Sequence, residues 1–160
     1  MPSETEDPRP AWSATAQMAL GAGPWVVVAL AQLVVYAVVH HRLPEQVVSH
    51  VGSSGPDGFM APLALVAITV GVFLAEALLF GYLLVRRRQT VGQYRLVAGL
   101  GWGVAAGEGY LLIGSFAANA GLSDPRDLHF PMSLHLPIAI GLCAVVGAVG
   151  VALARKADRR

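Results

Sequence analysis

Four long apolar runs dominate this sequence and restrict what it can fold into. They cover about residues 18–39, 61–85, 96–118 and 134–154. Each run has about 20 residues or more, and at about 1.5 Å of helical rise per residue it crosses an apolar layer of about 30 Å. The runs are continuously apolar and lack the in–out alternation of a barrel strand. We therefore predict an all-α fold, an integral membrane bundle of four transmembrane helices.

Composition agrees with a membrane environment. The chain has 160 residues, of which 55% are hydrophobic and 13% charged, whereas a soluble domain carries about 25% charged residues. The net charge of +1 argues against nucleic-acid binding, so the lipid bilayer is the expected partner. We predict one transmembrane domain over residues 14–154, preceded by a disordered polar tail over 1–13 and followed by a basic tail over 155–160.

Lysine and arginine predict the orientation of the bundle. Nine of the eleven lie in the two tails and in the connection between the second and third runs, whereas the other two connections hold only Arg42 and Arg126. By the positive-inside rule, both termini are cytoplasmic and the chain has two outer loops. The acidic N-terminal segment lacks a basic region, so we expect no cleavable signal peptide and a retained first span.

Two lone glutamates, Glu76 and Glu108, lie near the middle of the second and third runs. Counted from the cytoplasmic ends of these runs, their depths differ by about 4–5 Å. The connection between the runs is short, which predicts antiparallel neighbouring helices whose carboxyl groups can face each other. Carboxylates at this depth usually face the bundle interior, and two close ones cannot easily both ionise, so one should hold a proton near neutral pH.

Polar side chains continue outward from the glutamates at helical spacing. This pattern predicts three stripes that line a cleft, open to the outside and closed by the glutamates. One alternative is that each polar residue bonds to a neighbouring helix and the bundle is dry, and another is proton or ion coupling. The stripes consist of Gln32, Tyr36 and His40 in the first run, Thr69 in the second, and Ser115 and Asn119 in the third.

Small residues recur at four-residue spacing in the third run, and the fourth run holds further glycines. Small residues at such spacing let two helices approach closely in lipid. We expect these rows to pack helices within the bundle rather than to form the face of a dimer. The rows consist of Gly99, Gly103 and Gly107, of Gly101, Ala105 and Gly109, and of Gly141, Gly147 and Gly150.

All five histidines lie in or beside the predicted outer loops. Imidazole and carboxylate groups are good ligands for zinc and similar ions. A plausible metal site combines His50 with His129 or His135 and takes Asp57 or Asp127 as the oxygen ligand. The spacing matches no known metal signature, so solvated histidines or a pH-sensitive surface remain alternatives, and no cofactor is established beyond this candidate zinc.

The first outer loop carries a motif. It reads Leu43-Pro44, then His50, then Gly55-Pro56-Asp57-Gly58-Phe59. Set between two apolar runs, this motif resembles that of a bacterial membrane family catalogued as domain of unknown function 1648, and the resemblance covers about residues 25–85. Two departures are that Val48 stands where the family often has proline, and that the turn after Gly55 is one residue shorter than usual.

The resemblance implies a multi-pass protein of the bacterial cytoplasmic membrane. Longer relatives include immunity proteins that protect a cell from its own secreted toxin and pass a signal to a repressor, so an immunity or signalling role is implied. From the residues themselves, we expect Leu43-Pro44 to start the loop in an extended conformation, Gly55 to Gly58 to make a tight turn, and Phe59 to anchor the loop at the membrane interface.

Together these features favour a small integral membrane protein that senses or binds a ligand, toxin or ion at its outer face through the motif loop. The alternative is a proton- or ion-coupled transporter that uses Glu76 and Glu108. No nucleophile elbow, HExxH motif or phosphate loop is present, so we expect no enzyme, although a metal-dependent membrane enzyme would use the same histidines. A second copy of the chain or another membrane protein is a further expected partner.

Overall fold

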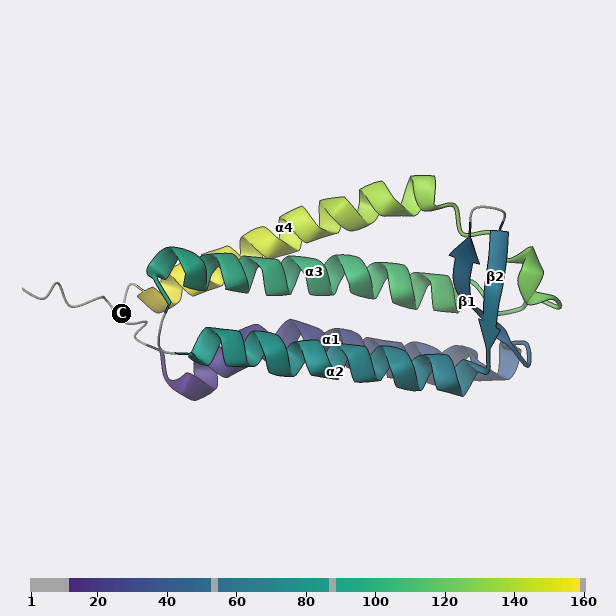
Figure 1. The fold of residues 1–160 in the computed structure, drawn as a ribbon, viewed down its shortest axis with the longest axis horizontal. Helices are drawn as coiled ribbons and strands as arrows, with labels where there is room; N and C mark the ends of the chain where they lie inside the picture. Colours follow the sequence, from purple (N-terminus) through teal and green to yellow (C-terminus); the bar gives the residue numbers. More distant parts are fainter. Residues whose placement is uncertain (1–11, 53–54, 87–88, 159–160) are drawn as a thin grey trace, which may run out of the picture.

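Four long helices make up most of the protein (Figure 1). In the computed structural model, which describes residues 12–52, 55–86 and 89–158, each of these helices is long and apolar enough to cross a membrane. The four apolar runs are thereby confirmed as helices, and they indicate a multi-pass membrane protein. Most of the predicted N-terminal tail, residues 1–11, lies outside the described residues. The helices are α1 (Ala14–Val39), α2 (Pro62–Val85), α3 (Val91–Ala117) and α4 (Met132–Asp158).

Capping residues determine where two of the helices begin. The Ser13 hydroxyl accepts a hydrogen bond from the Ala16 N–H at 3.3 Å and starts α1. Thr90 and Gln93 form a reciprocal capping box at the start of α3, with donor–acceptor distances of 3.0 Å and 3.3 Å. Because this cap precedes the apolar run, α3 begins earlier than the run predicts.

The helices pack as two close pairs. Helix α1 lies along α2, α3 lies along α4, and α1 also contacts α3, whereas the contact between α2 and α3 is looser. The expectation that α2 and α3 are close neighbours because of their short connection is therefore only partly right. The reason is that Trp25 of α1 fills the junction of the three helices, packed with Phe73 and Ala77 of α2 and Ala105 of α3.

Glycines bring α3 and α4 into direct backbone contact. A Cβ atom added to Gly103 would lie 2.6 Å from the carbonyl oxygen of Cys143, and one added to Gly99 would lie 2.7 Å from Cγ2 of Val151. On α4, a Cβ added to Gly147 would lie 2.9 Å from the carbonyl oxygen of Gly99. The prediction that small residues pack helices within the bundle is confirmed for these positions.

The predicted outer loop between α1 and α2 is a β-hairpin. Strand β1 (Val47–Gly52) pairs antiparallel with β2 (Gly55–Met60), and His50 lies opposite Gly58. The expected tight turn from Gly55 to Gly58 is wrong, because these residues form the first part of β2. The all-α prediction is right for the four helices and misses this hairpin, whose valine-rich first strand favours β structure.

The hairpin and a short 3-10 helix, η2 (Pro125–Asp127), lie together at one end of the bundle, and we call them the cap (Figure 1). Another 3-10 turn, η1 (His40–Arg42), leads from α1 toward the hairpin. The described ends of the chain and the connection between α2 and α3 lie at the opposite end, which we call the terminal end. There α4 continues to Asp158, so part of the predicted basic tail is helical.

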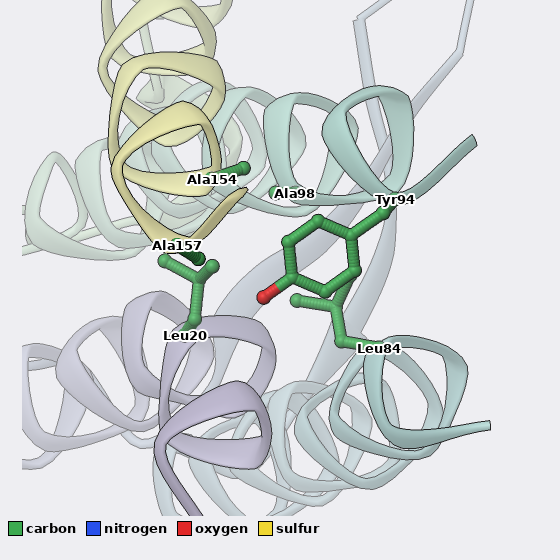
Figure 2. Close-up of a cluster of buried hydrophobic side chains, with 6 residues drawn as sticks. All are labelled: Leu20, Leu84, Tyr94, Ala98, Ala154 and Ala157. Carbon is green, nitrogen blue, oxygen red and sulfur yellow. The ribbon is translucent and has the colours of Figure 1, made fainter. Parts of the chain in front are cut away.

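All four helices converge near the terminal end (Figure 2). Figure 2 shows the ring of Tyr94 reaching from α3 toward Leu20 and Leu84. Nearby, the Trp102 Nε1–H donates to the Leu20 carbonyl oxygen at 2.9 Å and ties α3 to α1. The buried residues of this cluster are Leu20 of α1, Leu84 of α2, Tyr94 and Ala98 of α3, and Ala154 and Ala157 of α4.

Candidate functional site

The hairpin is fixed to the bundle by a buried asparagine. Asn119, just beyond the end of α3, accepts a hydrogen bond at Oδ1 from the Val48 N–H at 2.9 Å. Its Nδ2 group donates to the carbonyl oxygens of Ser115 and Phe116, at 2.9 Å and 3.4 Å. The neighbouring Val47 is fully buried in one cluster with Phe116. Asn119, which the spacing predicts in a cleft, therefore holds the hairpin in place.

The Leu43-Pro44 pair leads into the hairpin from η1. Leu43 is extended, with a ψ of 143°, as predicted for a residue before proline. Its N–H donates to the His40 carbonyl oxygen at 3.3 Å, and its side chain packs against the cluster of Val47 and Phe116. The first part of the motif thus positions the start of β1.

His50 and Asp57 form an exposed pair on the hairpin. The Nδ1 atom of His50 lies 2.5 Å from Oδ1 of Asp57, and the two side chains are 71% and 52% exposed. A Cβ atom added to Gly58 would lie 2.8 Å from Cβ of His50, and one added to Gly52 would collide with the Asp57 carboxylate. Gly55 has a φ of +118°, a conformation that favours glycine. These glycines let the two side chains meet.

The pair leaves the second ring nitrogen of His50 available to a ligand. When the neutral imidazole donates its Nδ1–H to the Asp57 carboxylate, the Nε2 atom carries the lone pair. A carboxylate that orients a histidine in this way is typical of histidines that bind a metal ion through the other nitrogen. The hairpin therefore presents one oriented acceptor, or metal ligand, to solvent.

Side chains from the second predicted outer loop complete the cap. The guanidinium carbon of Arg126 lies 5.5 Å from the centre of the Phe59 ring, a cation–π contact between η2 and β2. The Asp124 carboxylate accepts a hydrogen bond from the Arg126 N–H at 2.8 Å and stabilises this turn. The Gly121 N–H donates to the Arg42 carbonyl oxygen at 2.8 Å. The two predicted outer loops therefore form one packed unit.

The other predicted metal ligands are not gathered around His50. The Nδ1 atom of His135 lies 2.7 Å from the Tyr110 hydroxyl, and its ring stacks on Phe130 with 3.8 Å between ring centres. His129 is exposed. In the part of the chain that the structure describes, no three His, Cys, Asp or Glu side chains are placed to hold a metal ion together. Zinc binding stays a prediction, for which the structure supplies one oriented histidine.

The two glutamates of the apolar runs meet between α2 and α3. The carboxyl groups of Glu76 and Glu108 lie within hydrogen-bonding reach of each other. The Oε2 atom of Glu76 is buried, and no N–H or O–H group of the described residues donates to it. Two carboxyl groups at this distance bond to each other only when one of them carries a proton. The structure thus brings together the two groups that the depth estimate places at similar levels.

Two other buried polar side chains of the bundle have no hydrogen-bond partner among the described residues. Gln32 is 1% exposed, and both its amide nitrogen and its amide oxygen are unpaired. Trp25 is fully buried, and its Nε1–H is unpaired as well. Trp25 is absent from the predicted stripes, although it lies two helical turns before Gln32 and therefore on the same face of α1.

The remaining residues of the predicted stripes contact backbone carbonyl or aromatic groups. The hydroxyl groups of Thr69 and Ser115 donate to carbonyl oxygens one turn back in their own helices, at 2.8 Å and 3.1 Å. The Tyr36 ring packs beside His40 and Phe116, with ring centres 5.8 Å and 6.3 Å apart. Of the predicted stripes, Gln32 is therefore the member whose buried polar atoms have no hydrogen-bond partner among the described residues.

Two pairs of residues stand out as candidate sites. One is the exposed His50–Asp57 pair on the cap, and the other is the Glu76–Glu108 pair inside the bundle. Comparison of the chain with protein families, with curated proteins and with solved structures found no match.

Proposed function

We propose that this protein is a small multi-pass membrane protein that binds a ligand at the cap, through His50 and Asp57. The distribution of lysine and arginine supports an orientation with both termini in the cytoplasm and the cap on the outer side of a bacterial cytoplasmic membrane. The resemblance of the motif to proteins with domain of unknown function 1648 supports the same placement.

This proposal rests on one observation: His50 and Asp57 form an exposed pair of interacting side chains on a hairpin whose base is buried in the bundle. Asn119 and Val47 bury the base of the hairpin in the bundle, whereas His50 and Asp57 remain open to solvent. An oriented imidazole at this position is not needed to anchor the protein in the membrane. Residues that bind ligands commonly lie in loops held by a rigid scaffold, as His50 and Asp57 do. The matching ligand is a metal ion, or a toxin or other molecule that donates a hydrogen bond to Nε2.

The position of Asn119 supports a sensing role. Its side chain forms hydrogen bonds both to Val48 of the hairpin and to the last turn of α3. A shift of the hairpin would therefore displace the end of that helix. Sensing of this kind fits the immunity or signalling role that the resemblance implies. Asn119 connects the hairpin to α3 physically, and the use of this connection in signalling is part of the proposal.

The test is a zinc titration of the full chain in lipid nanodiscs, with wild type beside His50→Ala and Asp57→Asn. We expect zinc binding that is lost in His50→Ala and weakened by about 10- to 100-fold in Asp57→Asn, because asparagine orients the imidazole less strongly than a carboxylate. The matched control is His41→Ala, which removes another exposed histidine and should bind as wild type. Zinc binding that is absent, or that both site variants retain, would contradict the metal form of the proposal.

A second candidate function is proton- or ion-coupled transport, and the contact between Glu76 and Glu108 favours it. Four spans are few for a carrier, although a second copy would supply eight. The test is proton flux into proteoliposomes, with Glu76→Gln and Glu108→Gln at matched protein content. Flux that both variants abolish would support transport, and flux that is absent or indifferent to both would remove it.

A further inference from the structure

Trp25, Gln32 and Glu76 carry buried polar atoms that find no hydrogen-bond partner among the described residues. They are the Nε1–H of Trp25, the amide of Gln32 and the Oε2 atom of Glu76. Buried polar groups in proteins nearly always have a partner, and an unpaired group inside a membrane is especially unfavourable. Three such groups on facing helix surfaces therefore point to a partner that belongs to the folded protein.

The unpaired groups of α1 lie beside the carboxyl pair of α2 and α3. Trp25, Ala29 and Gln32 share one face of α1, and the first two pack with Phe73 of α2 and Ala105 of α3. The Trp25 ring lies 6.4 Å from the Phe73 ring and 5.4 Å from the Phe80 ring, measured between centres. Glu76 lies between these two aromatic residues in α2, so the junction that Trp25 fills is bordered by the carboxyl pair.

Glu76 and Gln32 lie at different heights along the bundle. A Cβ atom added to Gly21 would collide with the Phe80 carbonyl, which places these two residues side by side. In the antiparallel α1–α2 pair, Glu76 is then level with Trp25, and Gln32 lies about 10 Å nearer the cap. Helical side chains lean toward the N-terminus of their own helix, so Glu76 leans toward the cap and Gln32 leans away from it. The two side chains are therefore aimed at each other.

The described helices place no lysine or arginine near the carboxyl pair. No lysine or arginine lies in α1 or α2, and the nearest cation along α3, Arg95, is 13 residues before Glu108, about 20 Å away along the helix. On α4, the basic residues lie in the last turn, at the terminal end, and His135 is engaged with Tyr110. The negative charge of the carboxyl pair is therefore not neutralised by a lysine or arginine of these helices. The other titratable or charged groups of the helices are Tyr36, Tyr82, Tyr94, Arg95, Tyr110, His135, Cys143, Arg155, Lys156 and Asp158.

We infer that Glu76 and Glu108 share one proton, and that internal water held by Gln32 and the Trp25 Nε1–H completes their hydrogen bonds. This makes the junction of α1, α2 and α3 a hydrated proton site. Water fits because it can donate to a carboxyl oxygen and to an amide oxygen while it accepts from an indole or amide N–H. The site stands whether or not the cap binds a ligand and whether or not the protein transports anything.

The proton is tested with dicyclohexylcarbodiimide, an apolar reagent that adds to a protonated carboxyl group, applied to the full chain in nanodiscs at neutral pH. We expect an adduct by intact mass that peptide mapping places on Glu76 or Glu108 and that the Glu76→Gln/Glu108→Gln double variant lacks. Glu45, an exposed carboxylate before the hairpin, is the matched control, and Glu45→Gln should leave the adduct unchanged. An unlabelled wild type, or an adduct that survives in the double variant, would overturn the shared proton.

The water is tested through Gln32→Leu. Infrared spectra report how quickly the carboxylic acid C=O band of the pair shifts on transfer to D₂O. We expect rapid exchange in wild type and slower exchange in Gln32→Leu, because leucine cannot hold the water. Gln32→Met serves as a second variant if Gln32→Leu does not fold. If the carboxylic acid of the folded variant exchanges its hydrogen as fast as wild type and the variant unfolds at a higher temperature, the junction is dry. That result would overturn the proposal that water occupies it.

Discussion

The two faces of α3 carry the same pattern of small residues, and they pack in different ways. On the α4 face, a Cβ atom added to Gly103 would lie 2.6 Å from the backbone carbonyl oxygen of Cys143. On the face toward α2, a Cβ atom added to Gly101 would lie 2.8 Å from the ring of Phe80. A backbone carbonyl moves only with its helix, whereas an aromatic ring can turn about its side-chain torsions. The same spacing therefore builds a rigid seam on one face and an adaptable contact on the other.

The polar groups of the bundle follow this difference. The unpaired groups of Trp25, Gln32 and Glu76 lie on the side of α3 that faces α1 and α2. A seam in which backbone meets backbone leaves no space for water, but packing between side chains can adapt around it. The seam between α3 and α4 and the polar junction thus lie on different faces of α3, and glycine variants on the two faces should separate their roles.

The largest effect is expected for Gly103→Ala. The new methyl group must push α4 away at Cys143, and overpacking of this kind destabilises a protein by about 1–3 kcal/mol. The free energy of unfolding is measured by titration with sodium dodecyl sulfate in mixed micelles, followed by far-ultraviolet circular dichroism. A Gly103→Ala protein as stable as wild type would show that the seam can open without cost, and the contrast between the faces would disappear.

A smaller effect is expected for Gly101→Ala. The Phe80 ring can give way, and alanine gains about 1 kcal/mol of helix propensity over glycine, so the two contributions largely cancel. We expect the free energy of unfolding to stay within about 1 kcal/mol of the wild-type value in the same titration. A loss equal to that of Gly103→Ala would mean that Phe80 is held as firmly as a backbone, because its stack on Trp25 leaves it no freedom.

The helices could be predicted from the sequence, whereas the hairpin could not. Continuous apolar runs identify membrane helices because lipid offers no partner for backbone polar groups. The capping pair Thr90 and Gln93 also indicates where α3 begins, whereas the apolar run alone predicts a later start. Strand β1 holds only Val47, Val48 and Val51 as apolar residues in six positions, and its pairing with β2 depends on register rather than on composition.

The candidate sites show the same limit. The depths of Glu76 and Glu108 in the bundle follow from counting residues along two regular helices. The contact between their carboxyl groups can therefore be predicted from the sequence. His50 and Asp57 meet only because the hairpin folds them onto one another, which spacing does not reveal. Periodicity predicts Asn119 on a helical stripe, but α3 ends at Ala117, so the periodicity no longer describes where its side chain points.

The smallest change in packing is expected for Gly141→Ala on α4. Apart from its own helix, no atom of the described residues lies within 4 Å of an added Cβ there, in contrast to the glycines of the seam, so the substitution meets no clash. Alanine should therefore stabilise α4 by about 0.5–1 kcal/mol through backbone entropy and helix propensity. The unfolding titration is run at two protein-to-detergent ratios. A stabilised variant fits a face that meets only lipid, whereas a destabilisation that grows at the higher ratio would show that this face packs against a second copy, so that α4 would be bound tightly on both sides.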